Sequence, residues 1–347
     1  MDRAQVGTAM RAVVQRRYGG PEVLGLEAVT MPEPRPDEVL VAVHAVDVAS
    51  GDVRVMRGEP RLMRLFFGLL RPKVPTVGRD IAGTVAAVGS AVTRFAVGDR
   101  VCGEASQGGW AEYAVLPERF AVRLPEAVRF TDAATLPVSA GTALQGLRLA
   151  GIDPTRDTGA GAGAGTGASR PRLLVIGASG GVGGFAVQLA VLAGCDVVGV
   201  CSADKSEHVL ALGASAVLDR RTAWASGEAD GSYDAVFDLA GAQTLGELSR
   251  LVRRGGTVVL SAGGGDGLLG PIPRLLAAVV RGPFVPVSLK PLAAGRNLAD
   301  LEALVGLLAD GRIRSMVDRV VPLSDASAAA TEFLAGGVRG KLVLAVR

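Results

Sequence analysis

A glycine-rich turn at residues 177–183, with the sequence GASGGVG, has the composition and spacing to bind a phosphate-containing cofactor. It reads Ala178-x-Gly180-x-x-Gly183, a variant of the dinucleotide-binding fingerprint with alanine in the first position. The missing side chain at Gly180 lets backbone N–H groups approach a pyrophosphate, and Gly183 lets the next helix lie close to the preceding strand. We predict that the cofactor-binding residues of this turn are Ala178, Ser179, Gly180, Gly181, Val182 and Gly183.

The segments on both sides of the turn supply the elements that must position it. The apolar run Leu173–Ile176 predicts a strand buried on both faces. Apolar residues then recur at helical spacing up to Gly194, and Val197–Val200 predicts a second buried strand. This order favours a right-handed crossover between parallel strands, and it directs the free N–H groups of the helix N-terminus at an anion. A purely structural glycine turn is the alternative.

The residues after the second strand indicate NADPH rather than NADH. A site that prefers NADH usually has Asp or Glu about 20 residues after the glycines. Here Cys201 and Ser202 stand in that place, so a ribose 2′-phosphate would meet no carboxylate. We expect Lys205, with Arg220 and Arg221, to supply positive charge to it. Asp204 argues against this preference, and an ordinary solvated lysine is the alternative for Lys205.

Strands and helices continue to alternate up to about residue 260, which predicts a parallel sheet. We expect strands at 216–218, 233–239 and 257–260, with helices at 207–212 and 245–252. In open α/β sheets the ligand lies across the carboxyl ends of the strands. Small residues that would permit close approach of a cofactor follow two of these strands: Ala240, Gly241, Ser261, Ala262 and Gly263.

The composition fits a two-domain globular protein and argues against several other classes. The chain has 347 residues, 49% of them hydrophobic, and a net charge of +3, which with scattered arginines does not indicate a nucleic-acid partner. Three cysteines form neither a disulfide framework nor a metal motif, which favours a reducing cytoplasm. The first ten residues lack the apolar core of a signal peptide, and no apolar run is long enough to span a bilayer. We therefore expect a cytoplasmic protein without stable membrane insertion.

The N-terminal part predicts a separate, mostly β domain. We expect a loose tail at residues 1–9 and then short strands between proline- and glycine-rich turns, up to about residue 135. The segment 61–73, RLMRLFFGLLRPK, is apolar with basic residues at intervals. A packed surface segment, a cover over a substrate pocket and a membrane contact are its three interpretations. The glycine-rich run within 156–170 has no strand before it and no helix after it, so it predicts a flexible insertion.

Several short motifs, each present once, are distributed along nearly the whole chain, from Met10 to Val346. They are GRDIAG at 78–83, VGDRV at 97–101, GWAEY at 109–113, AATLP at 133–137, GTA at 141–143, the turn at 177–183, and Gly340-Lys341. With them the chain resembles the medium-chain dehydrogenase/reductase superfamily, and within it the zinc-free quinone oxidoreductase-like (zeta-crystallin-like) branch.

This resemblance implies an α/β fold with two domains. A Rossmann domain with a doubly wound parallel sheet would bind NADP over residues 138–291. A GroES-like β-barrel catalytic domain would comprise residues 10–137 and 292–347, with the active site in the cleft between the two. The resemblance also implies a homodimer.

The residues at the zinc positions of the family argue against a metal. A catalytic zinc needs about three protein ligands. Zinc-dependent relatives carry Gly-His-Glu where this chain has GRD at 78–80, and an early cysteine where residues 48–52 read VASGD. The four-cysteine structural lobe is also absent, and neither His44 nor His208 lies in a ligand motif. We expect no zinc.

Without a Lewis acid, the reaction that the resemblance implies is hydride transfer from NADPH to an acceptor that is already electrophilic, a quinone or an α,β-unsaturated carbonyl. Similar enzymes often carry Asn-Pro where this chain has Ala49-Ser50, which removes a polar group expected near the nicotinamide. Lys341 matches a position expected near the cofactor, with a solvated lysine at the start of a strand as the alternative. The candidate pocket residues are Ser50, Asp52, Arg54 and Thr142. Of these, Ser50, Asp52 and Thr142 are the predicted catalytic residues, although Asp52 is equally well a structural cap. We expect loops at 57–73 and 264–290 to shape the pocket and solvent to serve as a proton source.

Two other functions stay open. One is a pathway-specific enoyl or ketone reductase of secondary metabolism. The other is a catalytically idle NADPH-binding protein that acts as a sensor or scaffold, and the change at Ala49-Ser50 is the feature that favours it.

Overall fold

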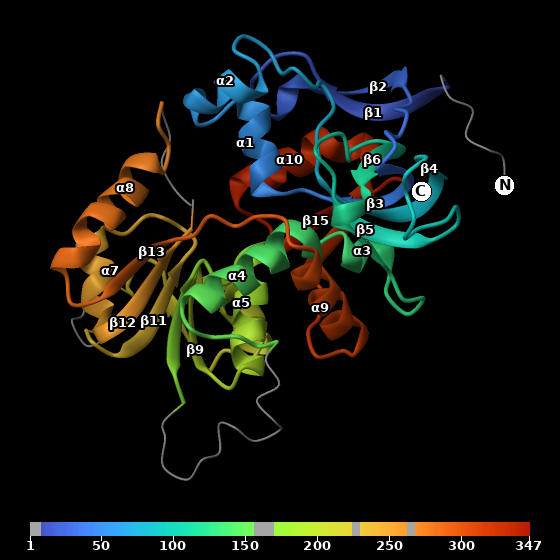
Figure 1. The fold of residues 1–347 in the computed structure, drawn as a ribbon. Helices are drawn as coiled ribbons and strands as arrows, with labels where there is room; N and C mark the ends of the chain where they lie inside the picture. The colour runs from blue at the N-terminus through green and yellow to red at the C-terminus, as the bar shows by residue number, and fades with distance from the viewer. Residues whose placement is uncertain (1–7, 156–169, 224–229, 262–267) are drawn as a thin grey trace. The chain divides into compact units, whose positions relative to one another are not determined.

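The computed structural model describes residues 8–155, 170–223, 230–261 and 268–347, and the chain divides into two compact units (Figure 1). Unit 1 comprises Met1–Gly141 and Arg296–Arg347, and unit 2 comprises Thr142–Gly295. The predicted insertion, apart from Arg170, and the predicted cofactor-binding residues Ala262 and Gly263 lie outside the described residues.

Unit 2 is built on a parallel sheet with the strand order β10-β9-β8-β11-β12-β13. Its strands are β8 (Arg172–Ile176), β9 (Asp196–Cys201), β10 (Ala216–Asp219), β11 (Tyr233–Asp238), β12 (Val252–Leu260) and β13 (Ser288–Pro291). The chain moves outward from β8 to β10 and then returns to the other side of β8 with β11, so the strand order reverses between β8 and β11. This confirms the predicted doubly wound sheet.

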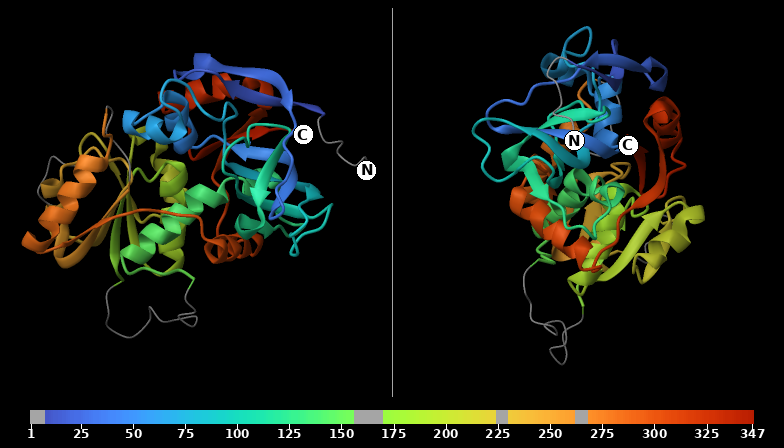
Figure 2. Two further views of the ribbon diagram at one scale, coloured as in Figure 1. Left: turned by 45° about the horizontal axis from the view of Figure 1, so that its top comes forward. Right: turned by 90° about the vertical axis from the view of Figure 1, so that its right-hand side faces the viewer.

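Helices cover both faces of this sheet, with α5 on one face and α8 on the other (Figures 1 and 2). The helices of this part of the chain are α4 (Gly141–Leu149), α5 (Gly181–Leu192), α6 (Ser206–Ala211), α7 (Leu245–Leu251) and α8 (Ile272–Arg281). The apolar runs that predicted the strands form the core, where Val175, Val236 and Val258 are fully buried.

The expectation that 264–290 is a loop is wrong, because this segment contains α8 and the start of β13. Prolines obscured the helix in the sequence, because Pro271 directly precedes it and Pro273 stands in its first turn, where proline is tolerated. Ile272, Leu275, Leu276 and Val279 do recur at helical spacing, but Ala278 is the only fully buried residue of the helix, so much of this apolar stripe faces solvent.

Unit 1 contains an antiparallel hairpin and a second sheet. The hairpin pairs β1 (Ala9–Gln15) with β2 (Leu24–Thr30). The sheet has the order β14-β15-β3-β4-β5-β7, with β6 also paired to β3. Its strands are β3 (Glu38–Asp47), β4 (Asp80–Val88), β5 (Arg100–Glu104), β6 (Tyr113–Pro117), β7 (Ala121–Arg123), β14 (Val317–Pro322) and β15 (Lys341–Ala345). The C-terminal strands thus join the N-terminal ones, because β15 runs antiparallel to β3.

The helices of unit 1 connect these strands and close its core. They are α1 (Ser50–Arg57), α2 (Arg64–Phe67), α3 (Phe130–Ala133), α9 (Leu298–Ala309) and α10 (Ala326–Ala335). Trp110, Met56 and Ile81 are fully buried in this core, and the Trp110 indole N–H donates to the carbonyl oxygen of Asp47 at 2.9 Å. Within the described ranges, no helix has the length and apolar character to cross a bilayer.

Candidate functional site

The glycine turn lies between β8 and α5, where the strand order of unit 2 reverses. Gly177 has a φ of 88°, a conformation that favours glycine. A Cβ on Gly183 would overlap the Gly177 carbonyl oxygen, so the fold itself requires glycine there. A Cβ on Gly180 would meet only that oxygen, at 3.5 Å, which is an ordinary contact. Because no described neighbour requires glycine at 180, the space beside it is open to a ligand.

The helix that follows the turn begins without a side-chain cap, because its N-cap residue is Gly180. The N–H groups of Gly177 and Ala178 already donate to the Val200 carbonyl, at 3.0 and 3.1 Å. The first-turn residues 181–183 have no acceptor one turn earlier in the helix. These donors, together with the positive dipole end of a 12-residue helix, fit the pyrophosphate of a dinucleotide.

Ala178 contributes to this turn only through its backbone. Its side chain is fully buried, and a Cβ added at Gly199 of β9 would lie 3.0 Å from the Ala178 methyl group. Alanine in the first fingerprint position therefore packs against β9 rather than facing a cofactor.

The residues predicted to surround a 2′-phosphate lie at the carboxyl ends of β9 and β10. The Arg220 N–H donates to the Cys201 carbonyl at 2.8 Å, one residue beyond the pairing of Asp219 with Cys201. The Ser202 carbonyl accepts from the Lys205 N–H at 2.9 Å and from the Cys201 thiol at 3.3 Å. Lys205 is only 9% exposed, so the interpretation of it as a solvated lysine is wrong. Burial raises the pKa of the Cys201 thiol, which favours its neutral form.

Asp238, the last residue of β11, is a candidate site residue that the sequence analysis missed. Its fully buried carboxylate accepts from the N–H groups of Ala240 and Gly241 at 3.1 and 3.0 Å. The same carboxylate pairs with the Arg274 guanidinium of α8 at 2.5 Å. The available signal was an aspartate directly after the apolar residues Ala235–Phe237, since burying a carboxylate requires partners of this kind.

This arrangement fixes the strand ends next to the glycine turn. The Leu239 N–H donates to the Ile176 carbonyl at 3.1 Å, and the Ser261 N–H donates to the Asp238 carbonyl at 3.0 Å. Ala240, Gly241 and Ser261 therefore share one edge of the sheet with the turn. The N–H groups of Ala240 and Gly241 already bond to Asp238, so a cofactor would contact these two residues through other atoms.

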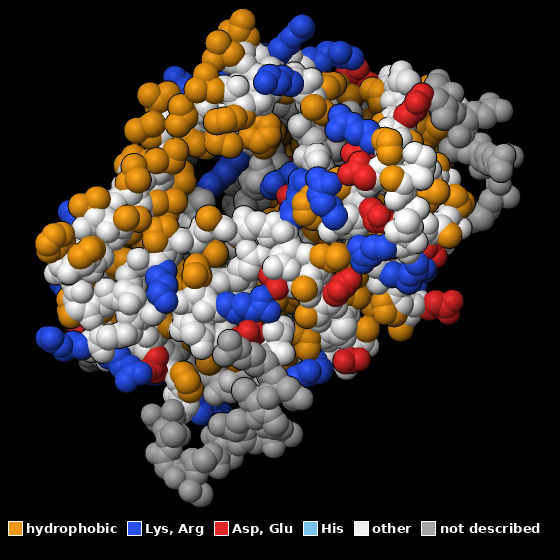
Figure 3. Space-filling view, viewed as in Figure 1, with side chains coloured by type: hydrophobic (Ala, Val, Ile, Leu, Met, Phe, Trp, Pro, Cys, Tyr) orange, Lys and Arg blue, Asp and Glu red, His pale blue; other side chains and the backbone are white. Residues whose placement is uncertain are grey.

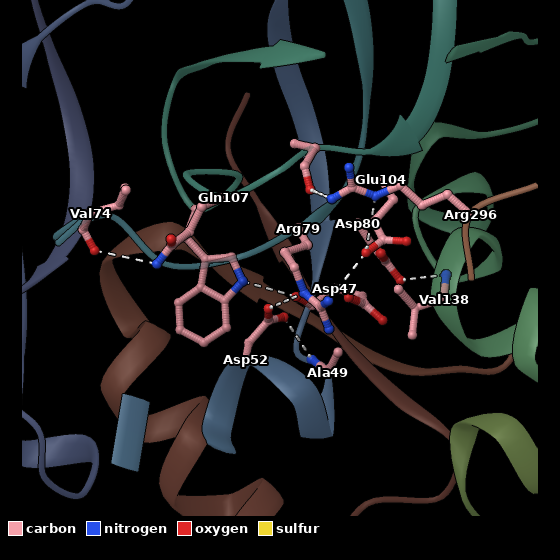
Figure 4. A network of polar contacts seen from close by, with 12 residues as sticks. Asp47, Ala49, Asp52, Val74, Arg79, Asp80, Glu104, Gln107, Val138 and Arg296 are labelled. Carbon is pink, nitrogen blue, oxygen red and sulfur yellow. Dashed lines mark hydrogen bonds and ion pairs between the residues drawn. The ribbon is translucent and has the colours of Figure 1, made fainter. Parts of the chain in front are cut away.

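Unit 1 contains a second candidate site, a charge cluster whose aspartates and lysine are buried and whose arginines and glutamate are partly buried. It comprises Asp47, Asp52, Arg79, Asp80, Glu104, Arg296 and Lys341. Arg79 lies between two carboxylates, with its Nε 3.4 Å from Asp52 Oδ1 and its Nη1 3.2 Å from Glu104 Oε1 (Figure 4). Arg296 reaches the same oxygen of Glu104 at 3.5 Å. The guanidinium of Arg79 thus occupies the centre of this acidic group.

Lys341 belongs to this cluster. Its ammonium group forms an ion pair with Asp47, and both side chains are buried. The pair joins the adjacent strands β15 and β3. The alternative of a solvated lysine is therefore wrong, and the geometry gives Lys341 a structural partner inside unit 1.

Burial raises the pKa of three carboxyl groups in the cluster. The pKa of Asp52 rises to about 6, because the effect of burial exceeds the opposing effect of Arg79. Burial and the nearby Asp47 raise the pKa of Asp80 well above its ordinary value. Burial likewise raises the pKa of Asp47, although Lys341 opposes it. In the cluster, Lys341 pairs with Asp47, and Arg79 pairs with both Asp52 and Glu104.

The predicted catalytic residues occupy different surroundings. Ser50 is exposed at the first position of α1, and Asp52 follows it in the same helical turn, where one oxygen accepts from the Ala49 N–H at 3.3 Å. This hydrogen bond supports the interpretation of Asp52 as a cap. Thr142 is half-buried in α4 of unit 2, and Arg54 is half-buried in α1.

The charge cluster does not fit a zinc ion. A guanidinium group carries positive charge and offers no lone pair, and Arg79 stands where zinc-dependent relatives have a histidine ligand. In the described ranges, no group of three or more His, Cys, Asp or Glu side chains could hold a metal. His44 instead stacks on Phe130 with ring centroids 4.3 Å apart.

Comparisons with known proteins agree on one family. Residues 35–126 match the alcohol dehydrogenase GroES-like domain, and residues 212–344 match the zinc-binding dehydrogenase family. A chloroplast envelope quinone oxidoreductase homolog from Arabidopsis thaliana is 34% identical over 97% of this chain and 99% of its own length. An NADPH-dependent alkenal/one oxidoreductase, chloroplastic, from the same plant is 32% identical over 75% of this chain and 64% of its own length. The structure of the quinone oxidoreductase from Coxiella burnetii aligns with a TM-score of 0.82 and 25% identity, over 98% of this chain and all of the other.

Proposed function

Because this chain belongs to the medium-chain dehydrogenase/reductase superfamily, as a quinone oxidoreductase-like protein with a GroES-like and a Rossmann-like domain, we propose that it is a zinc-independent, NADPH-dependent reductase of quinones or α,β-unsaturated carbonyls. That it is an oxidoreductase follows from the family. The acceptor class, the choice of NADPH and the independence from zinc are our proposals.

The observation that carries the proposal is the carboxyl edge of the sheet in unit 2. There the open space beside Gly180 and the uncapped start of α5 adjoin the end of β9, where Cys201 and Ser202 leave the expected carboxylate position without charge. We assign the pyrophosphate to residues 179–183 and the 2′-phosphate to Ser202, Lys205 and Arg220. The ends of β11 and β12, fixed by Asp238, border the remaining length of the cofactor.

When bound, NADPH supplies the hydride. The chain itself then needs to orient the acceptor, to exclude water and to provide for a proton. Ser50 and Thr142 are the hydroxyl groups that we assign to the acceptor. We assign Asp52 a positioning role, because its oxygens bond to the Ala49 N–H and to Arg79. The Arg79 guanidinium offers no lone pair to a metal, which is why we propose acceptors that are electrophilic without a Lewis acid.

The cysteines and the relatives bear on the cellular compartment and the oligomeric state of the protein. All three cysteines are free and buried, which agrees with a reducing compartment. We propose the cytoplasm, with a plastid as the alternative because relatives are named as chloroplast proteins. We also propose a homodimer, as the family resemblance implies.

The test is a panel of acceptors with both cofactors. Oxidation of NADPH and of NADH is measured with ortho-quinones, para-quinones and 2-alkenals, and with a simple ketone as the control. We expect turnover with a quinone or alkenal, a lower KM for NADPH than for NADH, and no turnover of the ketone. Reduction of the ketone alone would favour the alternative of a pathway-specific ketone reductase. Tight NADPH binding without any turnover would favour the idle binding protein.

A further inference from the structure

The segment at residues 61–75, here called the basic apolar segment, turns large apolar side chains to solvent. Leu65, Phe66, Leu69 and Leu70 are between 61% and 88% exposed. Figure 3 shows hydrophobic side chains gathered over α2, with Lys and Arg side chains beside them. An exposed apolar group of this size on a globular protein indicates an interaction site.

This exposure does not come from a loose chain. The Tyr18 hydroxyl donates to the Gly68 carbonyl at 2.6 Å, and the Lys73 N–H donates to the Phe67 carbonyl at 2.7 Å. Arg64 donates to the Gly58 carbonyl at 3.0 Å and lies over the Tyr18 ring, 4.5 Å from its centroid. The backbone of the segment is thus held in a shape that keeps its apolar side chains outside the core.

The charge of the segment indicates an anionic partner. It contains Arg61, Arg64, Arg71 and Lys73 and no acidic residue. Arg64 serves the framework just described, whereas Arg61, Arg71 and Lys73 are exposed. Exposed apolar side chains bordered by cations are the pattern of segments that lie in the interface of an anionic membrane.

A cavity of about 460 Å³ adjoins the segment and carries a second, independent signal. Its lining comprises Gln15, Arg16, Arg71, Pro72, Lys73 and Pro75. Gln15 is 1% exposed, and neither the nitrogen nor the oxygen of its amide has a hydrogen-bond partner. A buried amide without partners is costly for the fold alone, so its presence beside two exposed cations indicates a polar, anionic ligand.

We propose that the basic apolar segment docks this protein on an anionic lipid bilayer. The side chains of Leu65, Phe66, Leu69 and Leu70 enter the interfacial region, and the cavity binds a headgroup phosphate through Gln15, Arg71 and Lys73. A soluble phosphate compound would leave the four apolar side chains in water, which is why a lipid fits better. Docking on a membrane does not depend on the proposed reductase function. Only the benefit of docking, which is access to acceptors that partition into lipid, rests on that function.

The first test is co-sedimentation of the full chain with vesicles. We expect binding to phosphatidylcholine vesicles that contain phosphatidylglycerol, weaker binding at high salt, and little binding to phosphatidylcholine alone. The triple variant Leu65→Ser/Phe66→Ser/Leu70→Ser should lose this binding. The matched control Leu276→Ser/Val279→Ser/Phe284→Ser removes comparably exposed apolar side chains of unit 2 and should keep it.

The second test addresses the cavity. Arg71→Gln/Lys73→Gln should weaken vesicle binding roughly tenfold or more. Gln15→Leu, of similar size, should weaken it severalfold while the melting temperature stays equal or rises, because a buried unpaired amide is removed. A merely structural glutamine would leave the vesicle affinity unchanged.

Three results would overturn the proposal. They are no binding to the phosphatidylglycerol vesicles at low salt, equal loss of binding in the control triple variant, and unchanged binding in both cavity variants. Direct binding of inorganic phosphate or glycerol 3-phosphate, without any vesicle binding, would overturn docking on a membrane and assign the cavity to a soluble ligand instead. None of these measurements uses turnover, so they fail or succeed separately from the proposed reductase activity.

Discussion

Two regions of the molecule differ in how their polar groups are satisfied. They are the carboxyl edge of the sheet in unit 2 and the charge cluster of unit 1. At the edge, glycines and an uncapped helix leave backbone donors available to a ligand. In the cluster, buried side chains of opposite sign neutralise one another, and Arg79 fills the centre. Backbone donors do not titrate, and presenting them requires no buried charge. The edge thus leaves donors available for the cofactor that we propose, whereas the ion pairs of the cluster join separate elements of unit 1.

The largest effect is expected from breaking the ion pair of the cluster. Lys341→Met leaves Asp47 buried without its cation, which should lower the free energy of unfolding by about 3–5 kcal/mol. Lys290→Met, at an exposed lysine of unit 2, should change it by about 0.5 kcal/mol or less. Urea unfolding at pH 7 measures both. If Lys341→Met instead folded normally and lost affinity for NADPH, Lys341 would be a cofactor residue after all.

At the edge, two neighbouring glycines should behave differently. Gly180→Val places a side chain in open space, so NADPH affinity should fall by about two orders of magnitude, since charge-assisted hydrogen bonds contribute about 1.5–3 kcal/mol each. Its melting temperature should stay close to that of the wild type. Gly183→Ala should lower the melting temperature, because its Cβ overlaps the Gly177 carbonyl oxygen.

Titration of NADPH by fluorescence, together with thermal melts, separates these two effects. Gly246→Ala in α7, where a new Cβ meets nothing closer than 4.0 Å, serves as the control and should affect neither. Undiminished NADPH binding by Gly180→Val would remove the edge from the site.

Asp52 should make the stability of the cluster depend on pH. Its pKa of about 6 in the folded protein exceeds the ordinary value of 3.8, so the folded state binds a proton that the unfolded chain has released between these values. The cost of the buried carboxylate is therefore absent below about pH 4 and fully present above about pH 6, where it amounts to about 2–3 kcal/mol. Asp52→Asn should match or exceed the wild type in stability at pH 7, and the difference should shrink on acidification.

Urea unfolding at pH 7, 6 and 5 measures this difference in stability. Asparagine is a suitable substitute because its side-chain amide oxygen can still accept from the Ala49 N–H. A difference that stays constant over this range would mean that Asp52 is ionised throughout.

The smallest effect concerns the choice of cofactor. Arg220→Gln should raise the Kd for NADPH roughly fivefold to tenfold, as expected for one charge at a partly exposed phosphate, and leave the Kd for NADH unchanged. Arg254→Gln, at an exposed arginine of β12 to which no role is assigned, is the matched control. Equal effects on both cofactors would show that Arg220 does not contact the 2′-phosphate.

The sequence predicts those elements whose structure depends on a local pattern of residues. The apolar runs of β8, β9 and β11 and the glycine turn indicate their structure directly, because burial on both faces and helix–strand contact restrict the residue types locally. The strand ends near Ala240 and Ser261 followed from the same alternation.

The cluster could not be predicted in this way. Asp47 and Lys341 are close only because β15 pairs with β3, and no local pattern records a partner so far along the chain. The same holds for Asp238, whose partner Arg274 lies on a helix that the sequence analysis did not find. The polar side chain of Gln15 in a strand likewise gave no sign of its unpaired amide.

The most direct test of the account is turnover after removal of metal. The protein is dialysed against a strong chelator, its zinc content is measured, and NADPH oxidation is followed with the best acceptor of the panel. We expect less than one zinc per chain and unchanged kcat, because the Arg79 guanidinium, which cannot bind a metal, pairs with the carboxylates of Asp52 and Glu104. Loss of turnover that added zinc restores would contradict it.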